Sequence, residues 1–349
     1  MGLKYSLLST PAWYLDGVRR YGHAGFTEAA KHWDPAHLQG VDMSGKHVLI
    51  TGANSGIGLA AASKFAEMNA TVHLLCRSET RGADARDSIK AASGNPNVHL
   101  HVVDVSDKGS VDGFVASWLD GGQAIHAYIH NAGVLPKTRQ ETAEGLELAW
   151  ATMLWGTYYI PQRLHTCLAA AASGPEGPAR IVHVGSGGMY AVYFDLDQYN
   201  STKGAYDGTW AYGNAKRAQA LLTERQAAEW KKDGILVSCV NPGWVDTPGI
   251  RRSLPDFNSG GTLRSPEQGA DSIVWLCAAP ADAGPAEASG KVVLDRQVES
   301  AHTFWRDTVV NDTTKTALWE LCDELTNGRG QGAASASATA EAAAAASSR

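Results

Sequence analysis

The chain has 349 residues, 44% of them hydrophobic, which is enough for one large α/β domain with a sizeable buried core. The formal net charge is -6 with acidic and basic residues interspersed, which argues against a nucleic-acid-binding surface. The five cysteines are odd in number and none lies at metal-clip spacing from another. We therefore expect no disulfide framework, no metal site and a cytoplasmic location, with organelle targeting left open.

Residues 1–44 are expected to form an N-terminal extension that precedes the catalytic fold. The sequence contains no run of 18 apolar residues that would predict a transmembrane helix, and no apolar run typical of a secretory signal. The extension is aromatic and partly basic, with Trp13, Tyr14, Tyr21, Phe26 and Trp33. We interpret it as a helical flap over the core. Contact with a membrane surface, or subunit docking in a homo-oligomer, is the alternative.

From about residue 45, short apolar runs typical of buried strands alternate with helical segments. Strands are expected at 46–51, 71–77, 98–105, 125–131, 180–186, 234–240 and 291–295. Helices are expected at 56–69, 80–92, 106–120, 145–172, 212–232 and 266–279. This alternation predicts one α/β domain over residues 45–327, a Rossmann-type doubly wound parallel sheet of about seven strands flanked by helices. Residues 253–263 are expected to be a mobile loop, and the Ala/Ser-rich tail 328–349 to be disordered.

A glycine-rich loop follows the first expected strand and leads into a helix. Glycines allow a tight turn and a close approach of the backbone to a pyrophosphate, whose charge the free N–H groups of the helix would bind. The spacing Gly-x-x-x-Gly-x-Gly after a threonine resembles the short-chain dehydrogenase/reductase (SDR) family. The resemblance covers roughly residues 45 to 300 and implies an oxidoreductase that uses a nicotinamide cofactor. The candidate cofactor-binding residues here are Gly52, Asn54, Ser55, Gly56, Ile57 and Gly58.

The end of the second expected strand bears on the choice of cofactor. An acidic residue there would accept hydrogen bonds from the adenine ribose hydroxyls of NAD, but none occurs before Glu79. Arg77 instead offers a planar cation suited to the 2′-phosphate of NADP. We therefore expect NADP(H) to be favoured over NAD(H), the alternative being that Arg77 is simply solvated.

The resemblance implies further cofactor contacts at the ends of later strands, the edge at which doubly wound sheets bind ligands. In the family these positions contact the adenine, the cofactor ribose and the nicotinamide amide, respectively. They correspond here to Asp104 and Val105, to Asn131, Ala132 and Gly133, and to Pro242, Gly243 and Thr247.

Reduction of a carbonyl also needs a proton donor. A tyrosine can serve if a nearby cation lowers its pKa of ~10, and a lysine four residues on lies on the same helix face. The SDR motif is accordingly Tyr-x-x-x-Lys with an upstream serine, for which Ser186 is the candidate. The motif occurs twice, at Tyr199 with Lys203 and at Tyr212 with Lys216.

We choose Tyr212, although Tyr199 lies at the more usual distance from Ser186. The residues that follow Lys203 include glycines and have low helix propensity, whereas the residues that follow Lys216 have high helix propensity. The interval from Tyr212 to Pro242 also fits one helix plus one strand. The prediction is that Ser186 orients the substrate oxygen, Tyr212 is the acid/base, and Lys216 lowers its pKa and holds the ribose.

A narrower resemblance links this chain to one SDR subfamily with an aromatic N-terminal extension and a long insertion before the catalytic tyrosine. Residues 13–21 and 242–249 carry it. One departure stands out. Aligning residues 150–156 on the fourth helix of the family puts Met153 where members often carry an asparagine that holds a relay water. This implies an altered proton relay or a weak enzyme.

We predict an NADP(H)-dependent oxidoreductase that interconverts a carbonyl and an alcohol on a small, apolar or lipid-like substrate. The alternative is an NADP(H)-binding regulatory or scaffold protein with little turnover. Met153 favours that alternative, whereas the intact set of Ser186, Tyr212 and Lys216 argues against it.

Overall fold

The computed structural model describes residues 3–257 and 259–327, so the tail 328–349 lies outside the described residues. The chain divides into two compact units between Val309 and Val310. The second unit contains helix α12 (Asp312–Thr326), which begins where the Asn311 side chain accepts a hydrogen bond from the Thr314 backbone at 2.8 Å. The domain limits expected from the sequence stay a prediction.

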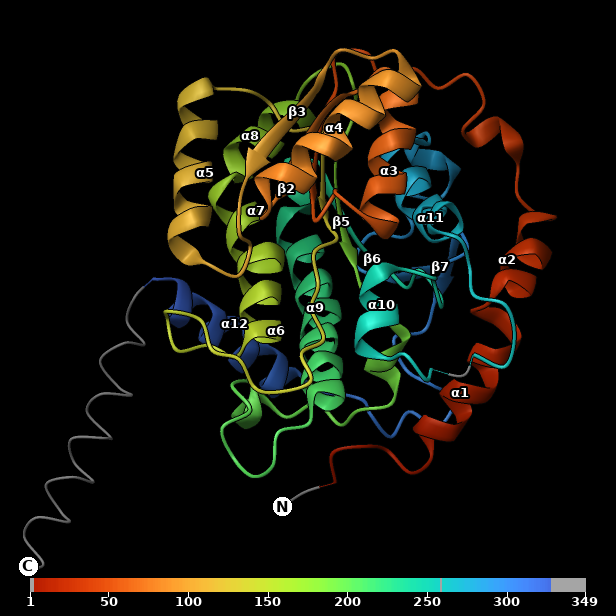
Figure 1. The fold of residues 1–349 in the computed structure, drawn as a ribbon, viewed down its shortest axis with the longest axis vertical. Helices are drawn as coiled ribbons and strands as arrows, with labels where there is room; N and C mark the ends of the chain where they lie inside the picture. Colours follow the sequence, from red (N-terminus) through yellow and green to blue (C-terminus); the bar gives the residue numbers. More distant parts are fainter. Residues whose placement is uncertain (1–2, 258, 328–349) are drawn as a thin grey trace, which may run out of the picture. The chain divides into compact units, whose positions relative to one another are not determined.

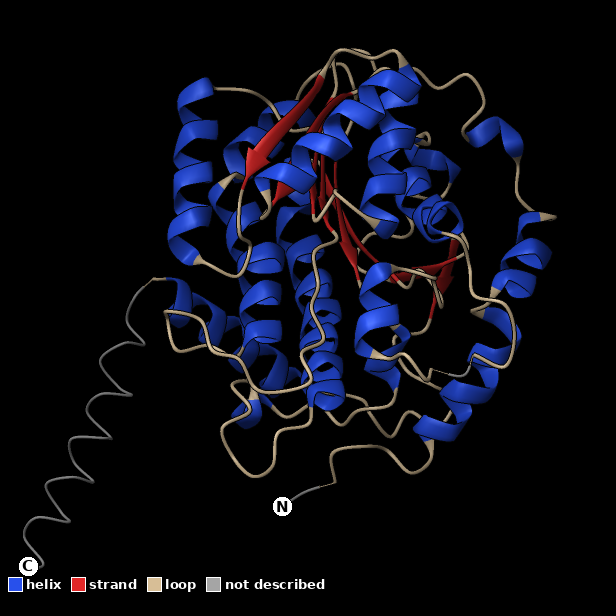
Figure 2. Ribbon diagram, viewed as in Figure 1, coloured by secondary structure: helices blue, strands red, loops and turns tan. Residues whose placement is uncertain are grey.

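The first unit is built around one twisted sheet with the strand order β3-β2-β1-β4-β5-β6-β7-β8 (Figures 1 and 2). The first seven strands are parallel, and their order reverses direction at β1 and β4, which confirms the doubly wound Rossmann-type prediction. Their bounds are β1 His47–Thr51, β2 Thr71–Cys76, β3 Val98–Val102, β4 Ala127–His130, β5 Ala179–Val184, β6 Ile235–Val240 and β7 Val292–Leu294.

An eighth strand, β8 (Gln297–Glu299), pairs antiparallel with β7 and was not expected from the sequence. Its two-residue turn places Asp295 and Arg296 at φ 52° and 59°, conformations that glycine or asparagine usually supplies. Side-chain contacts hold both residues there, since Arg264 binds the Asp295 carboxylate at 2.6 Å and Arg296 pairs with Asp271 at 2.7 Å. The turn is thus fixed by tertiary ion pairs that local sequence does not reveal.

Helices cover both faces of the sheet (Figure 1). One face carries α3 (Gly56–Glu67), α4 (Glu79–Ser93) and α11 (Pro266–Ala278). The other carries α5 (Lys108–Gly121), α8 (His165–Ala172) and α9 (Gly208–Trp230). Shorter pieces are α10 (Pro248–Ser253), η3 (Gly187–Tyr190), η4 (Leu196–Gln198), η5 (Lys231–Asp233) and η6 (Ala281–Ala283).

The helix expected over residues 145–172 is not one continuous helix. It consists of α6 (Leu148–Met153), a π-helical segment η2 (Leu154–Tyr159), α7 (Ile160–Arg163) and α8. A Cβ atom on Gly156 would lie 2.0 Å from the His130 ring, so the π segment passes directly against the end of β4. Such π segments often occur at functional sites.

The N-terminal extension is helical, as predicted. It contains α1 (Ser9–Arg20), α2 (His23–Ala30) and the short η1 (Pro35–His37). Helix α1 lies against the loop after β6, where a Cβ atom on Gly17 would meet the Trp244 ring at 2.4 Å. No helix in the described part of the chain is long and apolar enough to cross a membrane.

Candidate active site

The glycine loop after β1 has the backbone that its sequence predicts. Gly52 and Gly56 adopt φ values of 65° and 54°, which favour glycine. A Cβ atom on Gly58 would lie 2.4 Å from the Asn131 amide nitrogen, so this position must also stay small. The Ser55 side chain makes no capping hydrogen bond to α3, which leaves the first N–H groups of the helix available for a phosphate.

The end of β4 is hydrogen-bonded to this loop. The Thr51 hydroxyl accepts hydrogen bonds from the backbone N–H groups of Asn131 and Ala132, both at 3.0 Å. The Asn131 amide donates to the carbonyl oxygens of Thr51 and Gly52, at 3.0 and 3.2 Å. A Cβ atom on Gly133 would lie 3.6 Å from the Lys216 ammonium. The structure thus brings the β1 loop, the end of β4 and Lys216 together.

Arg77 follows β2 with its side chain 61% exposed, and its guanidinium lies 3.7 Å from the Asp104 carboxylate. Asp104 also accepts hydrogen bonds from the Ser106 backbone at 2.9 Å and from the Ser106 hydroxyl at 2.6 Å, which holds the turn after β3. Val105 is buried. Arg77 is therefore an exposed, loosely paired cation that can receive an anion.

The residues after β6 reach the glycine loop from the other side. Thr247 caps α10 by accepting a hydrogen bond from the Ile250 backbone at 3.2 Å. Its methyl group would lie 3.1 Å from a Cβ atom on Gly56, so the starts of α3 and α10 adjoin. Gly243 has φ 77°, and a Cβ atom there would meet the Arg264 guanidinium at 2.5 Å. This turn therefore requires glycine.

Helix α9 positions the candidate catalytic pair. It begins at Gly208, earlier than expected, because the Asp207 side chain accepts a hydrogen bond from the Trp210 backbone at 3.0 Å. Tyr212 and Lys216 lie one turn apart, with the ammonium 5.7 Å from the centre of the Tyr212 ring. A side-chain hydrogen bond joins Tyr212 to Ser186, which follows β5. The three predicted catalytic residues therefore meet in the structure.

Burial shapes the protonation of this group. It raises the pKa of the Tyr212 hydroxyl, an effect that the hydrogen bond to Ser186 opposes. It lowers the pKa of Lys216 to about 8. The Lys216 ammonium donates to the Val184 carbonyl at 2.6 Å and to the Gln219 side chain at 3.0 Å. Near neutral pH, Lys216 can therefore exchange a proton at low energetic cost.

The second Tyr-x-x-x-Lys motif lies outside α9. Tyr199 comes directly after η4, and its ring packs on Trp150 with centroids 5.4 Å apart. Ser201 and Gly204 have positive φ values, so the chain does not run as a helix from Tyr199 to Lys203. Tyr199 and Lys203 therefore lack the one-turn relation that Tyr212 and Lys216 have.

A buried polar network beneath Lys216 escaped the sequence analysis. The Gln219 amide donates to the Thr157 hydroxyl at 3.0 Å, and the Gln226 amide donates to the Thr157 carbonyl at 2.8 Å. Gln226 also bonds His183 at 2.9 Å. The sequence does contain a pattern that indicates this network, because polar residues recur at helical spacing along the face of α9 that is buried. Met153, at the end of α6, is buried, and α6 packs against α9.

The aromatic residues of the extension form a second feature that the sequence did not place. Trp13, Tyr14 and Tyr21 surround Trp244, with ring centroids 6.1, 5.9 and 5.6 Å from it. A Cβ atom on Gly187, next to Ser186, would lie 2.6 Å from the Trp13 indole nitrogen. Helix α1 thus supplies an apolar wall beside the predicted catalytic serine.

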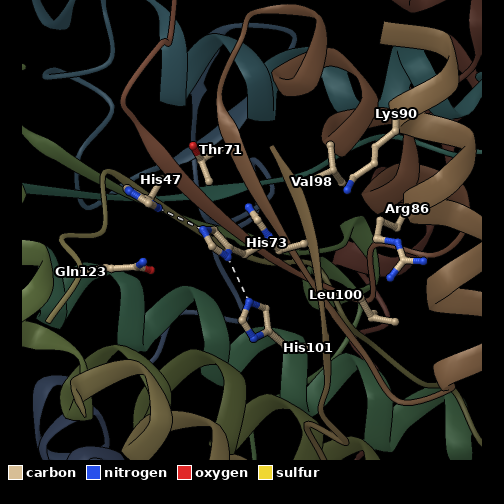
Figure 3. Close-up of a pocket in the computed structure, with 10 residues that line it drawn as sticks. His47, Thr71, His73, Arg86, Lys90, Val98, Leu100, His101 and Gln123 are labelled. Carbon is tan, nitrogen blue, oxygen red and sulfur yellow. Dashed lines mark hydrogen bonds between the residues drawn. The ribbon is translucent and has the colours of Figure 1, made fainter. Parts of the chain in front are cut away.

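A separate cavity of about 460 Å³ lies at the amino ends of β1, β2 and β3 (Figure 3). His73 joins His47 and His101 through hydrogen bonds of 3.0 Å each, and Lys90 and Arg86 approach from α4 (Figure 3). None of the predicted catalytic or cofactor-binding residues lines this cavity. Within the described residues, no group of His, Cys, Asp and Glu is arranged to hold a metal ion.

Known proteins resemble this chain over most of its length. Residues 52–277 match the family model described as Enoyl-(Acyl carrier protein) reductase. This match, the Rossmann-type sheet and the relatives below show that the chain belongs to the short-chain dehydrogenase/reductase family of oxidoreductases, which have an NAD(P)-binding fold.

Among its relatives, the chain is 38% identical to Dehydrogenase/reductase SDR family member 12 of Bos taurus, over 91% of this chain and 98% of that protein. It is 29% identical to human Retinol dehydrogenase 11, over 82% of this chain and 87% of that protein. It is 31% identical to mouse Polyprenol dehydrogenase, over 68% of this chain and 72% of that protein. Among solved structures, L-sorbose reductase from Gluconobacter frateurii, in complex with NADPH and L-sorbose, matches this fold with a TM-score of 0.55 at 25% identity. The match covers 72% of this chain and 95% of that one.

Proposed function

We propose that this protein interconverts an alcohol and a carbonyl on an apolar, lipid-like substrate, with NADP(H) as cofactor and Ser186, Tyr212 and Lys216 as catalytic residues. The observation that carries the proposal is the junction of the three side chains, in which Tyr212 is hydrogen-bonded to Ser186 and lies one turn from Lys216. This is the set of groups that proton transfer to a substrate oxygen requires.

The residues divide the proton chemistry between them. In the reductive direction the Tyr212 hydroxyl gives its proton to the substrate oxygen, on which negative charge develops, and the Ser186 hydroxyl donates a hydrogen bond to the same oxygen. The tyrosinate that results is stabilised by the nearby ammonium of Lys216. Because burial lowers the pKa of Lys216 to about 8, this lysine can return a proton to Tyr212 and regain one from solvent.

The cofactor site fits a dinucleotide with a 2′-phosphate. Uncapped N–H groups at the start of α3 and the glycines of its loop suit the pyrophosphate, and exposed Arg77 suits the 2′-phosphate. Asp104 and Val105 would contact the adenine, Asn131, Ala132, Gly133 and Lys216 the ribose, and Pro242, Gly243 and Thr247 the nicotinamide amide. When bound, the nicotinamide supplies or accepts the hydride.

The substrate class is inferred from the aromatic wall beside Ser186. Trp13, Tyr14, Tyr21 and Trp244 form an apolar cluster with few groups that would bind a charged substrate. Tyr21 and Trp244 are buried in it, and Trp13 and Tyr14 are the partly exposed members that a substrate could contact. Two relatives, by their names, act on retinol and polyprenol, which are long apolar alcohols. An apolar chain could pack on this wall while its oxygen lies at Ser186 and Tyr212.

The direct test is a screen of NADPH oxidation and, in parallel, of NADH oxidation with purified protein. The panel holds long-chain aldehydes and ketones, isoprenoid aldehydes, and matched polar sugars. We expect turnover with the apolar carbonyls and little with the sugars. Turnover confined to polar carbonyls would refute the proposal that the substrate is apolar. Turnover with NADH alone would refute the proposal that the cofactor is NADP(H).

A regulatory protein that binds NADP(H) with little turnover is the second candidate, and Met153 is the observation that favours it. The same screen separates the two, provided that cofactor binding is measured in parallel by calorimetry. Binding of NADPH without turnover on any carbonyl would favour the regulatory protein.

A further inference from the structure

We propose that the outer face of α1, together with the tip of the 303–309 loop, is a docking surface for an anionic lipid membrane. Here this surface is called the α1 face, and it consists of Leu7, Leu8, Leu15, Val18, Phe304 and Trp305. The inference goes beyond the proposed reaction, because it concerns where the protein sits and is testable without turnover.

Helix α1 has two apolar faces, and only one of them is buried in the protein. Trp13 and Gly17 point to the aromatic wall around Trp244. Leu8 and Leu15, seven residues apart, share the opposite side of the helix and are 51% and 69% exposed. Exposed Pro11 and Val18 continue this stripe, which runs for about 15 Å. A second apolar face on a surface helix is typical of a contact with another molecule or with lipid.

The 303–309 loop extends the stripe at the start of α1. The hydroxyl groups of Ser6 and Ser9 both donate to the Asp307 carboxylate, and the Ser9 hydroxyl lies 2.5 Å from that of Thr303. These bonds fix the loop beside the helix. Phe304 is 90% exposed and packs edge-on against Trp305, with centroids 5.6 Å apart. Two exposed aromatic rings thus lie beside the start of α1, where Leu7 and Leu8 are also exposed.

The charges around the α1 face indicate anionic lipid rather than a second copy of the chain. Arg19 and Arg306 are exposed at its rim, and no ion pair of either is formed within the described residues. The acidic side chains of α1 and of the 303–309 loop are already bound, because Asp16 pairs with Arg20 and Asp307 accepts the bonds from Ser6 and Ser9. A rim that is basic without acidic counterparts is not self-complementary, but it matches phosphate and carboxylate headgroups.

The position of the surface also fits the proposed substrate. The buried side of α1 forms the wall beside Ser186, and the exposed side is the α1 face. One helix would therefore lie between the acyl chains of the membrane and the catalytic serine. An apolar alcohol or aldehyde dissolved in the bilayer would then lie one helix away from the proposed site.

The test is co-sedimentation of the full chain with vesicles, without cofactor or substrate. We expect binding to phosphatidylcholine vesicles that contain phosphatidylserine, and roughly tenfold weaker binding to pure phosphatidylcholine. The double variants Leu8→Ser with Leu15→Ser and Phe304→Ser with Trp305→Ser should each weaken binding roughly tenfold or more. Arg19→Gln with Arg306→Gln should remove most of the preference for phosphatidylserine.

Two matched controls separate the α1 face from general surface effects. Leu119→Ser removes a leucine exposed elsewhere, on α5, and Lys232→Gln removes an exposed cation elsewhere; both should bind as the original protein does. Melting curves check that each variant is folded. Failure of the original protein to bind vesicles would overturn the proposal. So would a lipid-free dimer, seen by light scattering, that the Leu8→Ser and Leu15→Ser changes convert to monomer. Neither result depends on whether the protein reduces carbonyls.

Discussion

At the scale of single residues, the choice of cofactor depends on Arg77. Its side chain is 61% exposed and its contact with Asp104 is long, at 3.7 Å, so little must be broken for it to bind a phosphate. No acidic side chain stands at the end of β2 to favour a free ribose hydroxyl.

We therefore expect NADPH to bind at least about tenfold more tightly than NADH, since a charge-assisted pair with the phosphate contributes more than ~1.4 kcal/mol. Arg77→Asp should reverse the order. Calorimetric titration with both cofactors measures this, and equal dissociation constants for the unchanged protein would contradict it.

Met153 gives a second prediction at this scale. Its thioether cannot hold a relay water as an amide can, so we expect turnover below the ~10 s⁻¹ median of enzymes. Met153→Asn should raise kcat and leave the NADPH dissociation constant unchanged, because the glycine loop is untouched. The buried amide could cost ~1–3 kcal/mol, so melting is checked in parallel. A folded variant with no gain in kcat would show that Met153 only fills space.

At the scale of elements, β1, β2 and β3 carry an unusual row of imidazoles. His47, His73 and His101 are hydrogen-bonded in series. The ring of His126 stacks on His47 at one end, and the ring of His99 stacks on the central His73. Trp118 of α5 packs edge-on against the row. Burial, and repulsion from the neighbouring imidazoles, lower the pKa of His73 to about 2. The other charged groups around the row are Lys90, Arg86, Lys46 and Glu176.

The row makes stability dependent on pH. A histidine in the unfolded chain has a pKa of about 6.5, so below that pH the unfolded state binds a proton that folded His73 does not. Stability is therefore complete above pH ~6.5 and falls as the pH drops, by about 2 kcal/mol from His73 alone between pH ~6.5 and ~5.

Urea unfolding over this range measures the effect. We expect His73→Gln to flatten the pH dependence by about 1.4 kcal/mol per pH unit, whereas His32→Gln, at an exposed position, should leave it unchanged. If the free energy of unfolding changed with pH by the same slope in the original protein and in the His73 variant, His73 would take up its proton without unfolding of the protein.

At the scale of the whole molecule, the sequence predicted the parallel sheet because buried strands read as continuous apolar runs, as in Leu49 and Ile50 of β1. It missed β8, because ion pairs from Arg264 and Asp271 fix its turn in place of glycine. It missed the break in the helix over 145–172, because the contact between Gly156 and His130 joins residues distant in the chain.

The candidate site likewise has features that the sequence predicted and features that it missed. Local motifs predicted the glycine loop and the pair Tyr212 and Lys216, since their chemistry lies in one turn or one helix. The aromatic wall and the contacts of Lys216 with Gln219 come from packing between elements, which spacing alone does not specify. The sequence could not predict the α1 face either, because it does not specify which side of the helix is buried and which apolar side chains stay exposed.

The central claim is that Tyr212, and not Tyr199, transfers the proton. Tyr212 lies one helical turn from its motif lysine and bonds Ser186, whereas Tyr199 packs on Trp150 outside the helix. The most direct measurement is the rate of NADPH-dependent reduction, on any accepted carbonyl, by Tyr212→Phe and Tyr199→Phe side by side. The account predicts a loss of ~10²-fold or more for Tyr212→Phe with NADPH affinity retained, and little change for Tyr199→Phe. A reversed order, or full activity in Tyr212→Phe, would contradict it.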